Sequence, residues 1–363
     1  MMKNRKKLAG VLATATVLTS AFAPLTVMAE DFDAYNPPVA EVEAGQIKGF
    51  MDDDTYTFLG VPYAASERFQ MPQKVEAWDG VYNAQAYGKT CKIPEQTSVG
   101  SDEMLWPHRY WIQGEDCQNL NIWTPSIQDG RKRPVMVWLH GGGFSAGSSI
   151  EQLAYDGENL SRAGDVVVVS VNHRLNVLGY LDLSPFGEKY RDSANAGNFD
   201  LIAALEWIRD NIEGFGGDPE NVTLFGQSGG GVKVWSLLQM PEADGLFHKG
   251  IIESGVIDPD LFGDIEAGNG REIIGAMLAE LGLEEKDVDQ LETLPYDQLA
   301  QAYENAAPKV AQKGEYVGNH PHKNQSYFGD AIKHGFREET KKIPLLIGTV
   351  LGEFDFGPAI SGK

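Results

Sequence analysis

Short, almost entirely apolar segments alternate along the chain with segments of helical periodicity, and this alternation limits the possible folds more than any other feature. Two of the apolar segments, 135–139 and 166–171, contain at most one polar side chain each. Such strands are typical of the centre of a parallel sheet, which is buried on both faces. The alternation therefore predicts an α/β protein with a mostly parallel central sheet and flanking crossover helices.

The expected elements can be placed by residue number. We expect one sheet built from strands at residues 119–123, 135–139, 166–171, 222–225, 251–253 and 345–348. Apolar residues recur at helical spacing over 201–212 and again from Ser228 to the residue before Pro241. From about residue 259 to 342 the pattern changes to polar helical segments, including 273–281 and 287–294. Because no proline- or glycine-rich linker separates it, we interpret this stretch as a helical cap inserted into one domain.

Ser228 is the candidate nucleophile. It lies at the centre of Gly226-Gln227-Ser228-Gly229-Gly230, which follows the expected strand 222–225 and begins an expected helix. On such a strand-to-helix turn the glycines let the backbone bend sharply, and the serine hydroxyl projects into a cleft. This context predicts an enzyme that transfers acyl groups through a serine.

A second serine, Ser145, fits the same five-residue pattern, in Gly143-Phe144-Ser145-Ala146-Gly147. It follows the strand 135–139 but leads into two further serines rather than into an apolar helical pattern, so the context favours Ser228. The spacing of Gly141, Gly143 and Ala146 also fits a relaxed dinucleotide-binding motif. That alternative is weak, because no clear helix follows and the next strand ends without the expected ribose-binding acid.

The glycines that precede Ser145 are candidates for an oxyanion hole. A tetrahedral intermediate carries a negatively charged oxygen, which backbone N–H groups stabilise only where no side chain blocks their approach. The run His140-Gly141-Gly142-Gly143 meets this condition. We assign Gly142 and Gly143 as two donors and Gly229, directly after the nucleophile, as the third.

The N-terminus and the net charge limit the partners. Residues 1–29 combine a basic start with a moderately apolar stretch and predict a secretory signal peptide, cleaved after Ala29. An uncleaved anchor is the alternative, which several threonines and Pro24 disfavour. The formal charge of −22 argues against binding to nucleic acid or to an anionic membrane. We expect a secreted protein; the charge does not identify a substrate, and the sequence leaves the oligomeric state open.

The chain contains two cysteines, Cys91 and Cys117. In a secreted protein an even number of cysteines is interpreted first as a disulfide, with two free buried thiols as the alternative. Neither residue has the spacing of a zinc site, so we expect no metal.

Several motifs in a fixed order resemble the type-B carboxylesterase and cholinesterase family of α/β-hydrolases, including its bacterial para-nitrobenzyl-esterase-like members. They lie at residues 58–64, 115–123, 140–143, 172–176, 215–219, 226–230 and 245–249. The resemblance implies an α/β-hydrolase fold, a serine acyl-enzyme mechanism without a cofactor, and a small-molecule ester as substrate. It also implies a disulfide between Cys91 and Cys117.

The resemblance further implies a catalytic triad in the order Ser, Glu, His. Glu353, shortly after the expected strand 345–348, resembles the acid, and Asp355 is its nearest rival. The acid would hold the imidazole in the right tautomer and stabilise the imidazolium. The family's histidine lies far beyond the acid, whereas no histidine follows Glu353 in this chain. We therefore expect an incomplete fold that lacks its C-terminal part, with the catalytic histidine absent from this chain.

Two residues beside the nucleophile depart from the family's pattern. Gln227 stands where a glutamate is common, and Gly229 stands where an alanine is common. We expect Gly229 to be equivalent to alanine, because only its N–H group is used. The sequence thus predicts a secreted carboxylic-ester hydrolase. The alternative, a non-catalytic cholinesterase-like binding module, is disfavoured because Ser228 and the glycine donors are retained.

Overall fold

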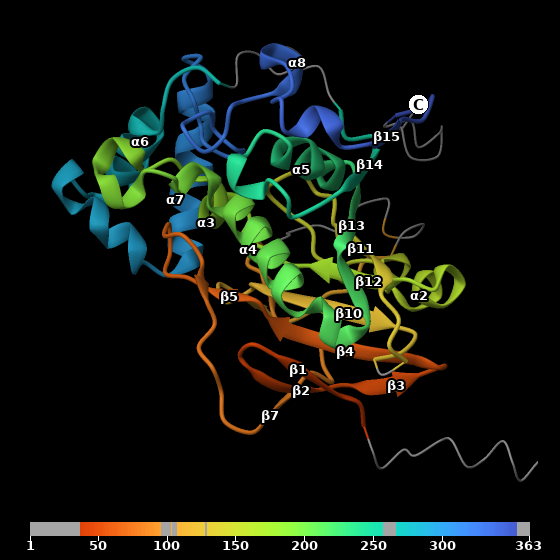
Figure 1. The fold of residues 1–363 in the computed structure, drawn as a ribbon. Helices are drawn as coiled ribbons and strands as arrows, with labels where there is room; N and C mark the ends of the chain where they lie inside the picture. Colours follow the sequence, from red (N-terminus) through yellow and green to blue (C-terminus); the bar gives the residue numbers. More distant parts are fainter. Residues whose placement is uncertain (1–36, 96–102, 104–106, 128, 257–265, 354–363) are drawn as a thin grey trace, which may run out of the picture. The chain divides into compact units, whose positions relative to one another are not determined.

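A mixed sheet of eight strands organises the chain from Val39 onward (Figure 1). Its strand order is β15-β14-β13-β11-β12-β10-β4-β3. Five neighbouring strands pair in parallel, in the order β12, β11, β13, β14 and β15. The strands β10, β4 and β3 extend the sheet beyond β12 through antiparallel pairings. The strands are β3 (Phe50–Asp52), β4 (Thr55–Pro62), β10 (Asn119–Thr124), β11 (Arg133–Leu139), β12 (Val167–Val171), β13 (Gly217–Gln227), β14 (Lys249–Glu253) and β15 (Leu345–Gly348).

The predicted α/β class is confirmed, and each of the six expected strands is present. Four of the seven strand pairings are parallel, so the sheet is mostly parallel as predicted. The difference lies at β10, which is buried along its whole length and yet pairs antiparallel with both neighbours. Burial on both faces is typical of parallel strands, and β10, in which three of the six residues are polar, shows that burial does not fix the direction of pairing.

The structure, a computed structural model, describes residues 37–95, 103, 107–127, 129–256 and 266–353. The predicted signal peptide (1–29), the rival acid Asp355 and the first part of the predicted cap lie outside these residues. The chain divides after Pro38, and every described helix and strand belongs to the second unit, Val39–Lys363.

The N-terminal elements were not expected from the sequence. They form a separate three-stranded sheet and two short ladders, in strands too short and too mixed in polarity to give a clear pattern. The strands are β1 (Val39–Val42), β2 (Gly45–Lys48), β5 (Ala64–Ala65), β6 (Gln73–Lys74), β7 (Val81–Asn83), β8 (Thr90–Cys91) and β9 (Gln113–Gly114).

Helices cover both faces of the central sheet. Alternate residues of β11 and β12, such as Val137 and Val169, join a buried cluster with α4 (Ala196–Asn211) and α5 (Gly229–Leu237). Side chains of the opposite parity, such as Val168, lie on the other face, where α2 (Glu158–Gly164) packs. Because α5 begins directly after β13, the turn between them lies at the C-terminal end of that strand.

The region predicted as a cap is predominantly helical. Its helices α6 (Arg271–Leu281) and α7 (Tyr296–Ala311) form a second apolar cluster with α3 (Asn176–Tyr180). The expected helix at 287–294 is a 3₁₀ helix, η8 (Glu285–Glu292), and α7, which falls in the predicted helical region without having been placed by residue number, contains Pro308. The remaining short helices are η1 (Leu153–Tyr155), η2 (Ser184–Phe186), η3 (Glu188–Tyr190), η4 (Ser193–Asn195), η5 (Ile212–Phe215), η6 (Pro241–Ala243), α8 (Ala331–His334) and η9 (Thr340–Lys342).

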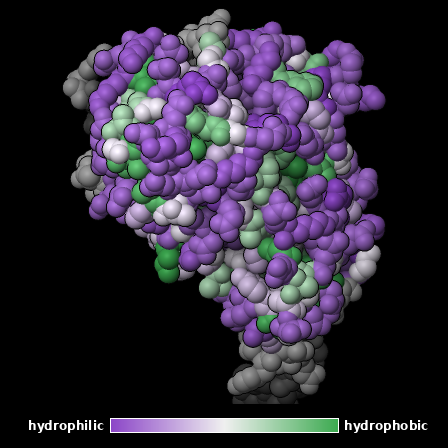
Figure 2. All heavy atoms as spheres, turned by 90° about the vertical axis from the view of Figure 1, so that its left-hand side faces the viewer, coloured by the Kyte–Doolittle hydropathy of each residue, from purple (hydrophilic) through white to green (hydrophobic). Residues whose placement is uncertain are grey.

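The face that Figure 2 turns toward the viewer, which is the α6 side of Figure 1, is predominantly hydrophilic, and its hydrophobic side chains lie in small groups. Within the described residues, none of the helices has both the length and the apolar character needed to cross a membrane.

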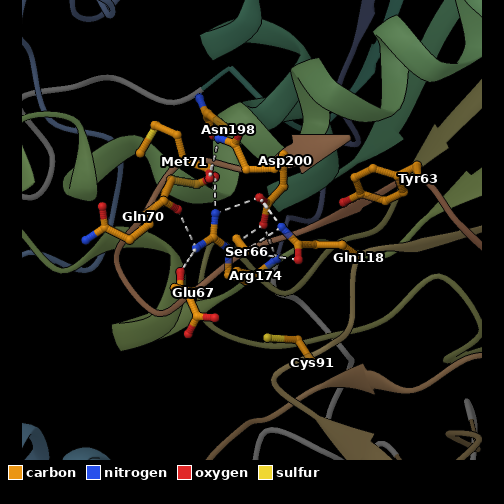
Figure 3. Close-up of polar contacts among 12 residues, drawn as sticks. Tyr63, Ser66, Glu67, Gln70, Met71, Cys91, Gln118, Arg174, Asn198 and Asp200 are labelled. Atoms are coloured by element: carbon orange, nitrogen blue, oxygen red, sulfur yellow. Dashed lines mark hydrogen bonds and ion pairs between the residues drawn. The ribbon is translucent and has the colours of Figure 1, made fainter. Parts of the chain in front are cut away.

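A buried ion pair fixes the loop after β12. Arg174 and Asp200, on α4, approach to 2.7 Å, and their side chains are 3% and 0% exposed (Figure 3). The same carboxylate accepts hydrogen bonds from the Arg174 amide at 2.9 Å and from Gln118 Nε2 at 2.7 Å. Arg174 also donates to the carbonyl oxygen of Gln70 at 2.8 Å. Because nearly all its polar atoms are hydrogen-bonded, the pair tolerates burial and ties β12 to α4.

We predict that Asp200→Ala lowers the free energy of unfolding by about 3–5 kcal/mol, because it leaves the Arg174 guanidinium buried without its carboxylate. Urea denaturation measures the change. Glu242→Ala, at an exposed position, is the control and should shift stability by less than about 0.5 kcal/mol. An Asp200→Ala variant as stable as this control would contradict the role given to the ion pair.

Candidate active site

Ser228 forms the turn between β13 and α5. Its φ of 55° and ψ of −124° lie in a region that residues with a side chain rarely adopt. Its amide donates to the carbonyl oxygen of Glu253 at the end of β14, at 2.8 Å, and its carbonyl accepts from the Val232 amide at 3.0 Å. Ser228 therefore lies on the sharp strand-to-helix turn that the sequence predicts.

The turn at Ser228 is in backbone contact with the turn that follows β11. A Cβ atom added at Gly230 would lie 1.9 Å from the carbonyl oxygen of Leu139, the last residue of β11. A Cβ atom at Gly229 would lie 2.2 Å from the amide nitrogen of Gly143. Real Cβ atoms essentially never approach backbone atoms so closely. The glycines thus let two backbones meet at the ends of neighbouring parallel strands.

The expected equivalence of glycine and alanine at position 229 is wrong for this chain. Only the N–H group of Gly229 is needed chemically, but a methyl group there would collide with Gly143. The neighbour is a backbone atom rather than the flexible end of a side chain. An alanine would therefore displace the turn after β11, and glycine permits the closer approach seen here.

The turn after β11 directs its carbonyl groups to partners within the protein. The carbonyl of His140 accepts from Lys233 Nζ at 2.8 Å, and that of Gly141 accepts from His140 Nδ1 at 2.8 Å. The carbonyl of Gly142 accepts from the amides of Ser145 and Ala146, at 3.3 and 3.1 Å. In the described part of the chain, no acceptor is present for the amides of Gly142 and Gly143.

These unused amides, together with that of Gly229, are the donors that the sequence assigns to an oxyanion hole. Gly142 and Gly143 have φ values of 82° and 61°, which favour glycine. Gly229 is the first residue of α5, where a helix leaves its amide groups without an intrahelical acceptor. Three amides free to bind an anion therefore occur on two turns that touch one another.

Ser145 lies inside the same turn and begins no helix. Its amide donates to Gly142, and the next regular helix, α2, starts at Glu158. The absence of a helix directly after this turn also removes the dinucleotide-binding alternative, which needs a helix N-terminus at the glycines. Of the two matching serines, Ser228 has the geometry of a nucleophile turn.

Glu353, the predicted acid, follows β15 and has an exposed side chain. Its Oε1 accepts from Thr349 Oγ1 at 2.5 Å and from the Val350 amide at 3.1 Å. Hydrogen bonds from Ser254, and then from Thr349 and Val350, lower the pKa of this carboxyl group. Ser254 follows β14 directly after Glu253, the acceptor of the Ser228 amide. The end of β14 therefore contacts both the nucleophile turn and the acidic loop.

Among the described residues, none of the histidines hydrogen-bonds to Ser228, the predicted nucleophile, or to Glu353, the predicted acid. His140 and His173 are fully buried and stacked, with ring centroids 5.3 Å apart. Burial, with a further contribution from Lys233, holds the pKa of each well below the usual value. The other five are His108, His248, His320, His322 and His334.

Cys91 and Cys117 are buried free thiols in the structure, where the sequence predicts a disulfide. Burial, and then a hydrogen bond to Cys91, raises the pKa of the Cys117 thiol. The two sulfur atoms are thus neighbours without being bonded, and the cross-link stays a prediction. Within the described residues, no group of three or more potential metal ligands is present.

Two small hollows flank the turn after β11. One, of 110 Å³, is bordered by Ser145 and by Tyr296 and Tyr303 of α7. The other, of 80 Å³, is bordered by Gly147 and Ser148. A helix of the predicted cap region therefore supplies aromatic walls beside the glycine turn. A larger cavity, of 320 Å³, lies elsewhere, between α4 and the N-terminal strands.

Sequence reasoning missed two residues of this site. Ser254 gave no signal, because a single serine after a strand is common in any loop. Lys233 did give one: it is a charged residue inside the apolar helical pattern of residues 232–238, and it is fully buried in α5.

Glycine-to-alanine variants test the contact between the turns. Gly230→Ala should lower the free energy of unfolding by about 1–3 kcal/mol, because its methyl group overlaps the Leu139 carbonyl. Gly275→Ala is the matched control in α6, where a Cβ atom meets nothing within 4 Å, and it should stabilise by about 0.5–1 kcal/mol. Chemical denaturation measures both. The same sign of change in the two variants would contradict the contact.

The chain is similar in sequence to several known proteins. A family model described as "Carboxylesterase family" matches residues 36–360. The para-nitrobenzyl esterase of Bacillus subtilis (strain 168) is 37% identical over 330 residues, which are 87% of this chain and 63% of that protein. The phenmedipham hydrolase of Pseudarthrobacter oxydans is 40% identical over 221 residues, or 60% of this chain and 43% of that protein.

Solved structures agree with the sequence matches. A structure described as an esterase from anaerobic Clostridium hathewayi that can hydrolyze aliphatic aromatic polyesters has a TM-score of 0.86 and 54% identity. It covers 89% of this chain, which spans 64% of that one. A structure of PNB esterase gives a TM-score of 0.73 at 34% identity, with 66% of that chain covered. The chain thus spans less than two thirds of the length of these relatives.

Proposed function

This chain belongs to the carboxylesterase family and has the α/β-hydrolase fold, and from that premise we propose that the protein is a secreted serine hydrolase of carboxylic esters. The observation that carries the proposal is the contact between the Ser228 turn and the glycine turn after β11. It brings together a serine on a strained turn and three amides free to bind an anion.

The proposed reaction begins with attack of Ser228 Oγ on the ester carbonyl carbon. The carbonyl oxygen becomes an oxyanion, which the amides of Gly142, Gly143 and Gly229 stabilise. Loss of one such donor typically costs about 3 kcal/mol of barrier. The bond to the alcohol oxygen then breaks, and the alcohol leaves with the proton that the serine gave up. Water hydrolyses the acyl-enzyme by the same steps in reverse, releasing the acid.

The proton transfer requires a base, and Glu353 is the residue proposed to orient it. Its hydrogen bonds favour the ionised form, which is the form that holds an imidazolium. We propose that none of the seven histidines of the 363 residues is this base. His140 and His173 are fully buried, and within the described residues none of the others hydrogen-bonds to Ser228 or Glu353.

The relatives suggest the substrate class. One acts, by its name, on para-nitrobenzyl esters, and another is described as hydrolysing aliphatic aromatic polyesters. In this chain, Tyr296 and Tyr303 border the hollow beside the glycine turn and offer aromatic surface to such groups. We propose esters with an aromatic acid or alcohol as substrates.

Replacement of the nucleophile tests the proposal. With the protein produced from its complete gene, Ser228→Ala should lower turnover of para-nitrophenyl acetate by roughly 10⁶-fold, because no acyl-enzyme forms. Ser184→Ala, at an exposed serine, is the control and should keep full activity. A fluorophosphonate should label the peptide that contains Ser228 and not the peptide that contains Ser145.

The non-catalytic binding module is the competing function, and the same labelling distinguishes it. A binding module would remain unlabelled, and neither the wild-type protein nor the Ser184→Ala variant would hydrolyse the ester. That result would reject the esterase.

We also propose that Cys91 and Cys117 form a disulfide in the secreted protein, as an oxidising compartment favours for two adjacent thiols. The intact mass under non-reducing conditions should be lower by two hydrogen atoms than after reduction. Cys91→Ala should then lower the free energy of unfolding by about 2–4 kcal/mol. Quantitative alkylation of both thiols in the unreduced, denatured protein would contradict the cross-link.

A further inference from the structure

A lysine is buried in the helix that begins at the nucleophile. Lys233 is 0% exposed and lies in α5, five residues after Ser228. Its ammonium group has three donors, and within the described residues its one hydrogen-bond acceptor is the carbonyl oxygen of His140, at 2.8 Å. Burial of a charge with so few partners is costly, which makes a purely incidental placement difficult to explain.

The acceptor of this bond lies at the base of the glycine turn. His140 follows the last residue of β11 and precedes Gly141, so its carbonyl group belongs to the peptide that leads into the turn. The next two carbonyl groups are held by atoms of the turn itself. The bond from Lys233 therefore differs from the others, since it joins the turn to the helix that carries Ser228.

The charged and titratable groups around Lys233 come from several elements. Burial lowers the pKa of Lys233 to about 7, against the opposing effects of Glu151 and Cys91. Burial raises the pKa of Glu151, while burial and then Lys233 lower the pKa of His140 and of His173. None of these groups forms a direct ion pair with the lysine in the described chain. The carbonyl of His140 is thus the contact that fixes the position of the ammonium group.

We propose that Lys233 is a positioning residue for the oxyanion hole. Its side chain holds the peptide after His140, so that the amides of Gly142 and Gly143 stay beside Ser228. The inference rests on the proposed esterase function. No hydrogen bond joins Lys233 to Ser228 in the described structure, so we assign its action to the glycine turn.

The test compares variants of the protein made from its complete gene, with rates expressed per serine titrated by a fluorophosphonate. Lys233→Met keeps the length of the side chain and removes the donor. It should lower kcat by about 10–100-fold, the effect expected of a displacement near 1 Å, and change KM by less than about threefold. Affinity for a trifluoromethyl ketone, which forms an oxyanion on the serine, should fall in parallel with kcat.

Val234→Ala is the matched control, because Val234 is the next buried residue of α5 and packs in the core. It should lower the melting temperature and leave kcat per titrated serine unchanged. Lys233→Gln, which keeps an N–H donor on a shorter side chain, should give an intermediate kcat. If Lys233→Met does not fold, Lys233→Gln is interpreted in the same way.

A wild-type kcat in Lys233→Met, or in Lys233→Gln if Lys233→Met does not fold, would overturn the proposal. So would a loss of kcat in Val234→Ala equal to that in Lys233→Met, since both would then report a merely structural role. Failure of the esterase proposal is recognised separately, because the wild-type protein would then neither react with the fluorophosphonate nor hydrolyse the ester.

Discussion

The close approach of two backbone turns, at the ends of the neighbouring parallel strands β11 and β13, is the constraint on which the candidate site depends. A single methyl group at Gly229 or Gly230 would force them apart. Parallel pairing brings both turns to the same edge of the sheet, and the glycines then let their backbones touch. The hydroxyl proposed as the nucleophile and the amides proposed to bind the oxyanion come together because of this contact, although they are more than eighty residues apart in sequence.

Two buried basic side chains, Arg174 and Lys233, are accommodated in different ways. Arg174 is neutralised by Asp200 and also contacts backbone carbonyls, an arrangement typical of a structural ion pair. Within the described residues, Lys233 has one hydrogen-bond partner, the carbonyl group of His140. The carboxylate of Glu151 raises the pKa of Lys233 without forming an ion pair with it. The first holds the loop after β12 on α4, whereas the second joins the glycine turn to α5. This difference separates a residue that supports the fold from one proposed to support the chemistry.

Much of this architecture could be predicted from the sequence, because its determinants are local. The apolar segments became the central strands, and the run from Gly226 to Gly230 became the strand-to-helix turn. Features that depend on partners distant in sequence could not be predicted. Alanine would not fit at position 229, because the backbone of Gly143 lies against Gly229. Helix α7 continues through Pro308 because its apolar face packs on α3 and α6. The pairing direction of β10 likewise depends on the neighbouring strands rather than on its own residues.

The central claim is that the amides of Gly142, Gly143 and Gly229 form one anion-binding site around Ser228. A crystal structure of the protein inactivated by a phosphonate ester tests it most directly. We expect a phosphorus atom bonded to Ser228 Oγ, with the phosphonyl oxygen about 2.7–3.1 Å from all three amide nitrogens. A phosphonyl oxygen directed away from the glycine turn, or a covalent bond to another serine, would contradict it.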